Sequence, residues 1–198
     1  MHSLPFNQQL QIISQRANTR RINANDRYLE VYPELLAGVQ ALLPLTRQNL
    51  ILAAHSVFGW MPTQLRVNMA QVNTVLTILH GVLHDGANVT VDDLALMAST
   101  FQPTGGNSVV AASKILHFFA PNRFPMWDRW VAKTWELPPS GPQAAANYDG
   151  FIQACLQFEL NPIGQQACAT LRQRLAQAGY AYPMTDMRVI ELIFFLPP

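Results

Sequence analysis

The stretch GGNSVVAASKILHFFAPNRFPMWDRWVAKTW, residues 105–135, decides the fold, and the rest of the chain is interpreted around it. A glycine pair opens the stretch. Asn107 or Ser108 is then suited to cap a helix, because either side chain accepts a hydrogen bond from a backbone amide that the helix leaves unpaired. The following residues are almost all apolar, which predicts a buried helix over 108–119 that stops before Pro121.

Asp128 follows a short bend and is suited to cap a second helix, over 128–135. On the first helix, Ser113, Lys114 and His117 form one narrow polar stripe, because residues three and four apart are neighbours on a helix. The stretch also holds both lysines of the chain and three of its four tryptophans. A polar stripe on an apolar helix, followed by a carboxylate at the next helix start, indicates a functional site.

A structural interpretation of the same residues stays open beside this one. A lysine on a buried helix often extends its ammonium group to water while its stem stays packed. An aspartate at a helix start is most often a cap, and a tryptophan cluster is most often core.

The composition limits the classes of protein to consider. A chain of 198 residues forms one large or two small domains and is long enough to bury a sizeable core. Its hydrophobic content of 49% with 13% charged residues favours a compact globular protein, with part of its surface open to a protein partner. The net charge of +1 means that no global field attracts nucleic acid or membrane, so any such binding needs a local patch.

Cellular location is indicated by what the sequence lacks. Cys155 and Cys168 lie in apolar or amide surroundings, which favours buried thiols in a reducing compartment over a disulfide or a metal site. The first residues do not resemble a signal peptide, and no apolar run approaches the length of a membrane span. We therefore expect a cytoplasmic protein that does not bind membranes.

Helical periodicity extends through most of the chain. We expect an all-α fold, one compact domain over 1–198, with a core at about 46–136 and C-terminal helices over 144–198 packed on it. The sequence contains no internal repeat and no convincing alternating strand. Beyond the central stretch, helices are predicted at about 4–17, 26–43, 46–58, 68–86, 90–101, 144–160 and 163–178, with Pro33 near the first turn or break of the second. The final apolar segment, 184–196, is either a helix or a buried tail.

Two further segments carry candidate ligand-binding residues. The segment 15–27 is the most basic in the chain and includes Arg16, Arg20 and Arg21, which could follow a phosphate backbone or form a solvated connector. Trp60 lies in a Gly-Trp-Met-Pro segment that could stack on a base or pack on its own core.

Histidine spacing raises a metal-dependent enzyme as a third possibility. His80 and His84 are four residues apart on a predicted helix and could share a metal ion, with His117 as a further ligand. No glutamate or third ligand stands near the pair, so no metal site is predicted.

The central stretch resembles the helix-hairpin-helix DNA glycosylases, in particular the 8-oxoguanine glycosylase group. The resemblance covers roughly residues 90–136. QPTGGNS stands where the family has its hairpin, and FPMWD resembles the segment that leads to the family's aspartate. The family's lysine stands just after the hairpin, whereas Lys114 lies further along the helix.

The resemblance implies a set of roles for residues of this chain. Lys114 corresponds to the lysine that attacks C1′ of the damaged nucleotide, and Asp128 to the aspartate that assists it. The hairpin residues Gly105, Gly106, Asn107 and Ser108 correspond to the turn that presents amides to a DNA phosphate, with a monovalent cation and no other cofactor. The family flips its base out of the duplex, and residues available here to bind DNA or hold the base are His117, Arg123, Trp127, Trp60, Arg20 and Arg21, with Phe124 and Trp130 as further stacking candidates.

A lysine nucleophile has a physical requirement: it must be uncharged, and burial on an apolar helix lowers its pKa. The leading hypothesis is therefore a DNA-binding base-excision enzyme, a hydrolase or lyase of DNA repair. The alternative hypothesis is a non-catalytic all-α interaction subunit of a bacterial or phage assembly. In that case Lys114, Asp128 and Arg123 form an internal ion-pair network.

Overall fold

The computed structural model describes residues 4–60, 64–103 and 106–197. Within these ranges the chain forms ten helices and one two-stranded sheet, which confirms the all-α class apart from that sheet. The helices are α1 (Phe6–Thr19), α2 (Arg27–Gln40), α3 (Arg47–Trp60), α4 (Val72–His84), α5 (Val91–Thr100), α6 (Val109–Phe119), α7 (Arg129–Thr134), α8 (Ala144–Leu160), α9 (Pro162–Gln177) and α10 (Asp186–Phe195). None of these helices is long and apolar enough to cross a bilayer.

The sheet was not expected from the sequence. Strand β1 (Leu65–Val67) pairs antiparallel with β2 (Phe101–Pro103), with Leu65 opposite Pro103. Each strand has only three residues, too few to show an alternating pattern. Because β2 follows α5 directly, the segment predicted as a hairpin between two helices begins as a strand.

Side-chain caps set the starts of several helices. Thr90 and Asp93 form the predicted capping box at α5, and the Ser108 hydroxyl accepts from the Ala111 amide at α6. The Thr46 hydroxyl likewise accepts from a backbone amide of the first turn of α3. The expectation for Pro33 was wrong, because α2 continues through it from the first turn to Gln40.

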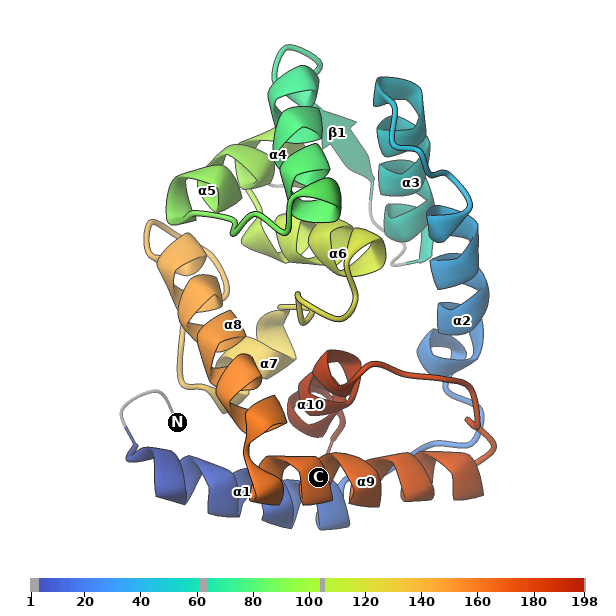
Figure 1. Cartoon of the computed structure of the whole chain (residues 1–198), viewed down its shortest axis with the longest axis vertical. Coiled ribbons are helices and arrows are strands. Elements are labelled where there is room, and N and C mark those ends of the chain that lie inside the picture. The colour runs from blue at the N-terminus through green and yellow to red at the C-terminus, as the bar shows by residue number, and fades with distance from the viewer. Residues whose placement is uncertain (1–3, 61–63, 104–105, 198) are drawn as a thin grey trace.

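The first helix packs against the last two helices. Figure 1 shows α1 running along α9 at one side of the molecule, with α10 between this pair and the other helices. The Arg174 guanidinium of α9 donates to the carbonyl oxygens of Ala17 and Arg20 and joins the two helices. Helices α4, α5 and α6 form a group at the opposite side, and α6 packs against α5.

One buried cluster extends through the described residues from α1 to α10. The inner helix α6 and the C-terminal helix α10 are its most buried members, with eight of the ten residues of α10 buried. Cys155 and Cys168 are buried free thiols, as predicted. The last helix is therefore part of the core and reaches the centre of the molecule.

Candidate active site

A cleft of about 440 Å³ opens where α6, α7 and α10 meet the start of α2 and the end of α3. Its walls combine aromatic side chains with five charged residues. The lining residues are Tyr28, Trp60, Ser108, Val110, Lys114, Met126, Asp128, Arg129, Trp130, Pro139, Ser140, Arg188, Glu191 and Phe195. The cleft thus brings together Lys114 and Asp128, the two residues that sequence reasoning assigned to catalysis.

Lys114 reaches the cleft from the middle of α6. Burial lowers the pKa of its amine, while the nearby carboxylates of Asp128 and Glu191 raise it and Arg188 lowers it further. The net direction is downward, because loss of water disfavours the ammonium form more than the carboxylates favour it. At a given pH, the uncharged form of the Lys114 amine is therefore more populated than that of a lysine in water.

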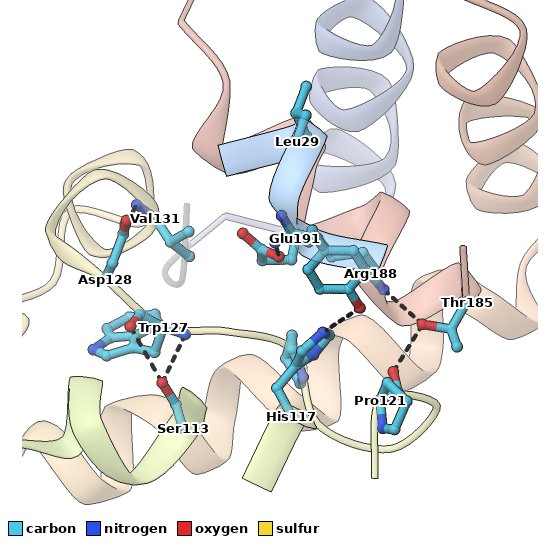
Figure 2. Close-up of polar contacts among 12 residues, drawn as sticks. Leu29, Ser113, His117, Pro121, Trp127, Asp128, Val131, Thr185, Arg188 and Glu191 are labelled. Atoms are coloured by element: carbon cyan, nitrogen blue, oxygen red, sulfur yellow. Dashed lines mark hydrogen bonds and ion pairs between the residues drawn. The ribbon is translucent and has the colours of Figure 1, made fainter. Parts of the chain in front are cut away.

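Asp128 is fixed at the rim by its position at the start of α7. Its Oδ1 accepts hydrogen bonds from the amides of Trp130 at 2.7 Å and Val131 at 2.9 Å, as a helix cap does. One residue earlier, the Trp127 amide donates to the Ser113 hydroxyl oxygen at 3.0 Å (Figure 2). Ser113 therefore joins α6 to the segment that carries Asp128 and sets the two elements relative to each other.

Arg188 and Glu191 form an ion pair on α10 that was not anticipated from the sequence. Each is only 2% exposed, and the Arg188 guanidinium lies 4.5 Å from the centre of the Tyr32 ring. Thr185 fixes the start of this helix, since its hydroxyl accepts from the Arg188 amide and donates to the Pro121 carbonyl (Figure 2). The i,i+3 spacing of an arginine and a glutamate within an apolar segment was the one available signal.

The ionisation of this pair reflects its burial. Burial raises the pKa of Glu191 above the ordinary range of a carboxyl group, and Asp128 adds to the rise, while Arg188 and Lys114 oppose it. Burial lowers the pKa of Arg188, but Glu191 and two tyrosines more than compensate, so the guanidinium stays charged. The cleft thus holds two carboxyl groups in different environments.

His117 does not line this cleft, although the resemblance assigned it to DNA or substrate binding. Its side chain is fully buried, and Nδ1 donates to the Phe124 carbonyl at 2.7 Å. Nε2 is then the acceptor for the Tyr32 hydroxyl, also at 2.7 Å. Burial lowers the pKa of His117 to about 3, so the ring is an uncharged internal bridge.

The tryptophans divide between core and cleft. Trp127 has 0% exposure and packs against Tyr148 and Phe151, so its ring has no face open to a base, contrary to expectation. Trp60 lines the cleft and packs edge-on against Tyr28. Trp130 is 48% exposed at the mouth of the cleft.

Most of the arginines predicted to contact DNA instead form hydrogen bonds within the protein. Arg20 is buried, and its Nε donates to the Ile193 carbonyl at 2.7 Å, while burial lowers its pKa to about 10. Arg16 is half-buried and donates to the Thr134 hydroxyl. Arg123 donates to the carbonyls of Val82, Gly86 and Ala87, at and just beyond the end of α4.

Arg21 alone of these candidates has an exposed side chain. In the basic segment 15–27, Arg16 and Arg20 therefore bond within the protein, whereas Arg21 and Arg27 are exposed. Because Arg123 is engaged at the end of α4, it also takes no part in an ion-pair network with Lys114 and Asp128.

The predicted hairpin is only partly described, because Gly105 lies outside the described residues. Gly106 has a φ of +110°, a conformation that glycine adopts easily. Its amide donates to the Pro103 carbonyl and the Ser108 amide donates to the Ala98 carbonyl, so neither is free for a phosphate. Asn107 is exposed and accepts a hydrogen bond from Gln102. The expected cation site involves residues 104–105 and stays a prediction.

The histidine pair was considered as a metal site, although none was predicted. His80 and His84 stack with ring centres 5.5 Å apart. In the part of the chain that the structure describes, no group of three or more His, Cys, Asp or Glu side chains could hold a metal ion. His117, the further ligand considered, is held by Tyr32 and Phe124.

Comparison of the chain with family models, curated proteins and solved structures found no match. Function is therefore inferred from the chemistry of the cleft.

Proposed function

We propose that this protein is a base-excision enzyme that cleaves the N-glycosidic bond of a modified or damaged base flipped out of DNA. The observation that best supports this proposal is that Lys114 and Asp128, from separate elements, line one cleft with aromatic walls. The cleft volume of about 440 Å³ is in the range of small-ligand sites.

Lys114 acts as the nucleophile in this proposal. Its uncharged amine attacks C1′ as the bond from C1′ to the base breaks, and the departing base keeps the bonding electrons and takes up a proton. The new secondary ammonium then loses one proton. The bond from C1′ to the ring oxygen breaks, and that oxygen takes the remaining proton of the nitrogen, which gives a hydroxyl group and an imine. Burial favours this route because it lowers the pKa of the amine.

Asp128 stabilises the positive charge that develops on the sugar as the base departs. Its carboxylate is held by two backbone amides, which fix its position before the substrate arrives. A charge that is already oriented stabilises a transition state without reorganisation, and electrostatic stabilisation of this kind often contributes more to catalysis than any other single effect.

The aromatic side chains of the cleft are suited to hold a flipped base and the strand beside it. Trp60 and Tyr28 provide ring faces or edges within the cleft. At the mouth, the Arg129 guanidinium lies 4.9 Å from the centre of the exposed Trp130 ring. Stacking on aromatic rings with cations nearby is a common way to bind unpaired nucleotides, so α7 replaces segment 15–27 as the proposed DNA contact.

Borohydride trapping tests the proposal. The protein is incubated with duplexes that contain either an abasic site or one of a panel of modified bases, and borohydride is added to reduce any imine. We expect a covalent protein–DNA adduct with the wild type and with Lys133→Arg, and none with Lys114→Ala. A wild type that forms no adduct and releases no base from any duplex contradicts the proposal.

The interaction-subunit alternative is supported by a different observation. Leu160 is 81% exposed and Ile163 is 45% exposed, and both lie at the corner between α8 and α9. Exposed apolar side chains of this kind are typical of contact surfaces. This alternative predicts that Lys114→Ala and Asp128→Asn lower the melting temperature together and that no duplex is a substrate.

A further inference from the structure

The cleft contains a second carboxyl group that the proposed mechanism has not yet used. Glu191 lines the cleft from α10, whereas Asp128 lines it from the start of α7 (Figure 2). The two differ in their surroundings: Asp128 is half-buried and accepts two backbone hydrogen bonds, and Glu191 is 2% exposed beside Arg188. A pair of carboxyl groups in such different environments is how several enzymes separate an ionised group from a protonated one.

Asp128 is held in place at the start of α7. The amides of Trp130 and Val131 donate to its Oδ1, so its carboxyl group cannot turn away from this position without breaking the helix cap. It is therefore the group suited to act from a fixed position.

Glu191 is suited to donate a proton. Burial in a low-dielectric site disfavours a carboxylate, and the nearby negative charge of Asp128 does so further. Arg188 stabilises the ionised form of Glu191, because its guanidinium pairs with the carboxylate once the proton has left. Both states of Glu191 can thus exist in the folded protein.

We propose that Glu191 is the general acid that protonates the departing base, an inference that rests on the proposed base-excision function. In this step the bond from C1′ to the base nitrogen breaks and its electron pair stays with the base. The base takes the proton from the Glu191 carboxyl group, and the resulting carboxylate pairs with Arg188. The secondary ammonium on Lys114 then returns a proton to Glu191, so that protons and charges balance.

Three charged groups among the described residues act on Glu191. The charged groups that face Glu191 are Arg188 on its own helix, Lys114 on α6 and Asp128 at the start of α7. The remaining titratable neighbours have pKa values raised by burial and are uncharged near neutral pH; they are Tyr32 on α2, Tyr148 and Cys155 on α8, and Tyr182 before α10.

The test separates base release from imine formation. A duplex with a preformed abasic site has no base to protonate, so Glu191→Gln should still form the borohydride adduct with it. On a duplex with an intact target base, the same variant should release the base about 100-fold more slowly, the usual contribution of a general acid. Lys114→Ala, in contrast, should lose the adduct on both duplexes.

The pH profile of base release distinguishes a general acid from a residue with only a structural role, because a structural role would leave this profile unchanged. Base release by the wild type should fall as the pH rises through the pKa of Glu191, because the acid form is lost there. In Glu191→Gln this decline should disappear, while Glu191→Asp should keep it at a lower rate.

Glu191→Gln leaves Arg188 as a buried charge without its carboxylate and could therefore impair folding. A second variant controls for this effect. Replacing both members, Arg188→Met with Glu191→Leu, removes the ion pair and keeps an apolar filling, which is often neutral or stabilising. We expect this double variant to form the abasic adduct and to release base as slowly as Glu191→Gln.

The outcomes distinguish the two proposals. Base release by Glu191→Gln and by the double variant at the wild-type rate overturns the role of Glu191 and leaves the base-excision proposal intact. A wild type that neither releases a base nor forms an adduct contradicts the base-excision proposal, and the role of Glu191 with it.

Discussion

The two sides of α6 show opposite uses of polar residues on one apolar helix. On the inner side, Ser113 and His117 are fully buried and bonded to fixed partners, the backbone of Trp127 for one and Tyr32 with Phe124 for the other. On the cleft side, Lys114 shares a solvent-connected space with Asp128. Polar residues on the inner side hold the fold, whereas those on the cleft side are available for chemistry. The difference can be tested on each side separately.

The largest expected effect is on the cleft side. Asp128→Asn keeps the helix cap, because asparagine caps as well as aspartate does, but it removes the negative charge. We expect base release to slow by about 100- to 1000-fold, the usual cost of losing a preorganised electrostatic group, with no change in melting temperature. The measurement is single-turnover base release from a duplex that the wild type cleaves.

Asp26→Asn is the matched control. Asp26 caps α2 in the same way, through hydrogen bonds from the amides of Tyr28 and Leu29. If both variants slow the reaction equally, the charge at position 128 has no special role.

The next effect is on the inner side. His117→Ala should lower the free energy of unfolding by about 3 kcal/mol, because it leaves the Tyr32 hydroxyl and the Phe124 carbonyl buried without their partner. Denaturant titration measures this loss, and His84→Ala, at an exposed position of α4, should change stability by less than about 0.5 kcal/mol. A His117 variant as stable as the wild type would show that the inner bridge does not support the fold.

The same bridge predicts a pH dependence of stability. The pKa of His117 is about 3 in the folded protein and about 6.5 in an unfolded chain, so between these values only the unfolded chain binds the proton. Stability attributable to His117 is therefore present above pH 6.5 and is lost as the pH falls toward 3, at up to about 1.4 kcal/mol per pH unit. Denaturant titrations from pH 7 to 4 should give a shallower pH dependence for His117→Gln than for the wild type. Equal slopes would contradict the assignment.

Several features of α6 and its neighbours could be predicted from the sequence. The caps at Thr90, Ser108 and Asp128 are local, because each depends on a side chain and an amide two or three residues away. Helix ranges could be predicted for the same reason. Lys114 and Asp128 were named as candidates from the sequence, but the sequence could not show that they line one cleft, as they do in the structure.

Other features depend on contacts between distant segments and could not be predicted. The stripe of Ser113, Lys114 and His117 did not reveal which members face inward, because this depends on where Tyr32 of α2 and the loop before Asp128 pack. Arg20 was interpreted as a phosphate contact because nothing local indicates that the Ile193 carbonyl of α10 is its partner. Glu191 was missed because its importance comes from the elements around it.

The smallest expected effect is at the mouth of the cleft. Arg129→Ala should weaken DNA binding by roughly fivefold and reduce the steepness of its dependence on salt by about one unit, as expected for one lost phosphate contact. Arg47→Ala, exposed at the end of α3 opposite Trp60, is the matched control and should change neither quantity. Binding isotherms at several salt concentrations measure both. Identical salt slopes for wild type and Arg129→Ala would place the DNA elsewhere.

The identity of the residue that carries the reduced DNA adduct tests the central claim most directly. The chain has only two lysines, and Arg123 lies between them, so protease cleavage after arginine separates the two in different peptides. We predict that mass spectrometry of the borohydride-trapped wild type finds the sugar remnant on Lys114. A remnant on Lys133 or on the N-terminal amine, or the absence of any adduct, would contradict the assignment of Lys114 as the nucleophile.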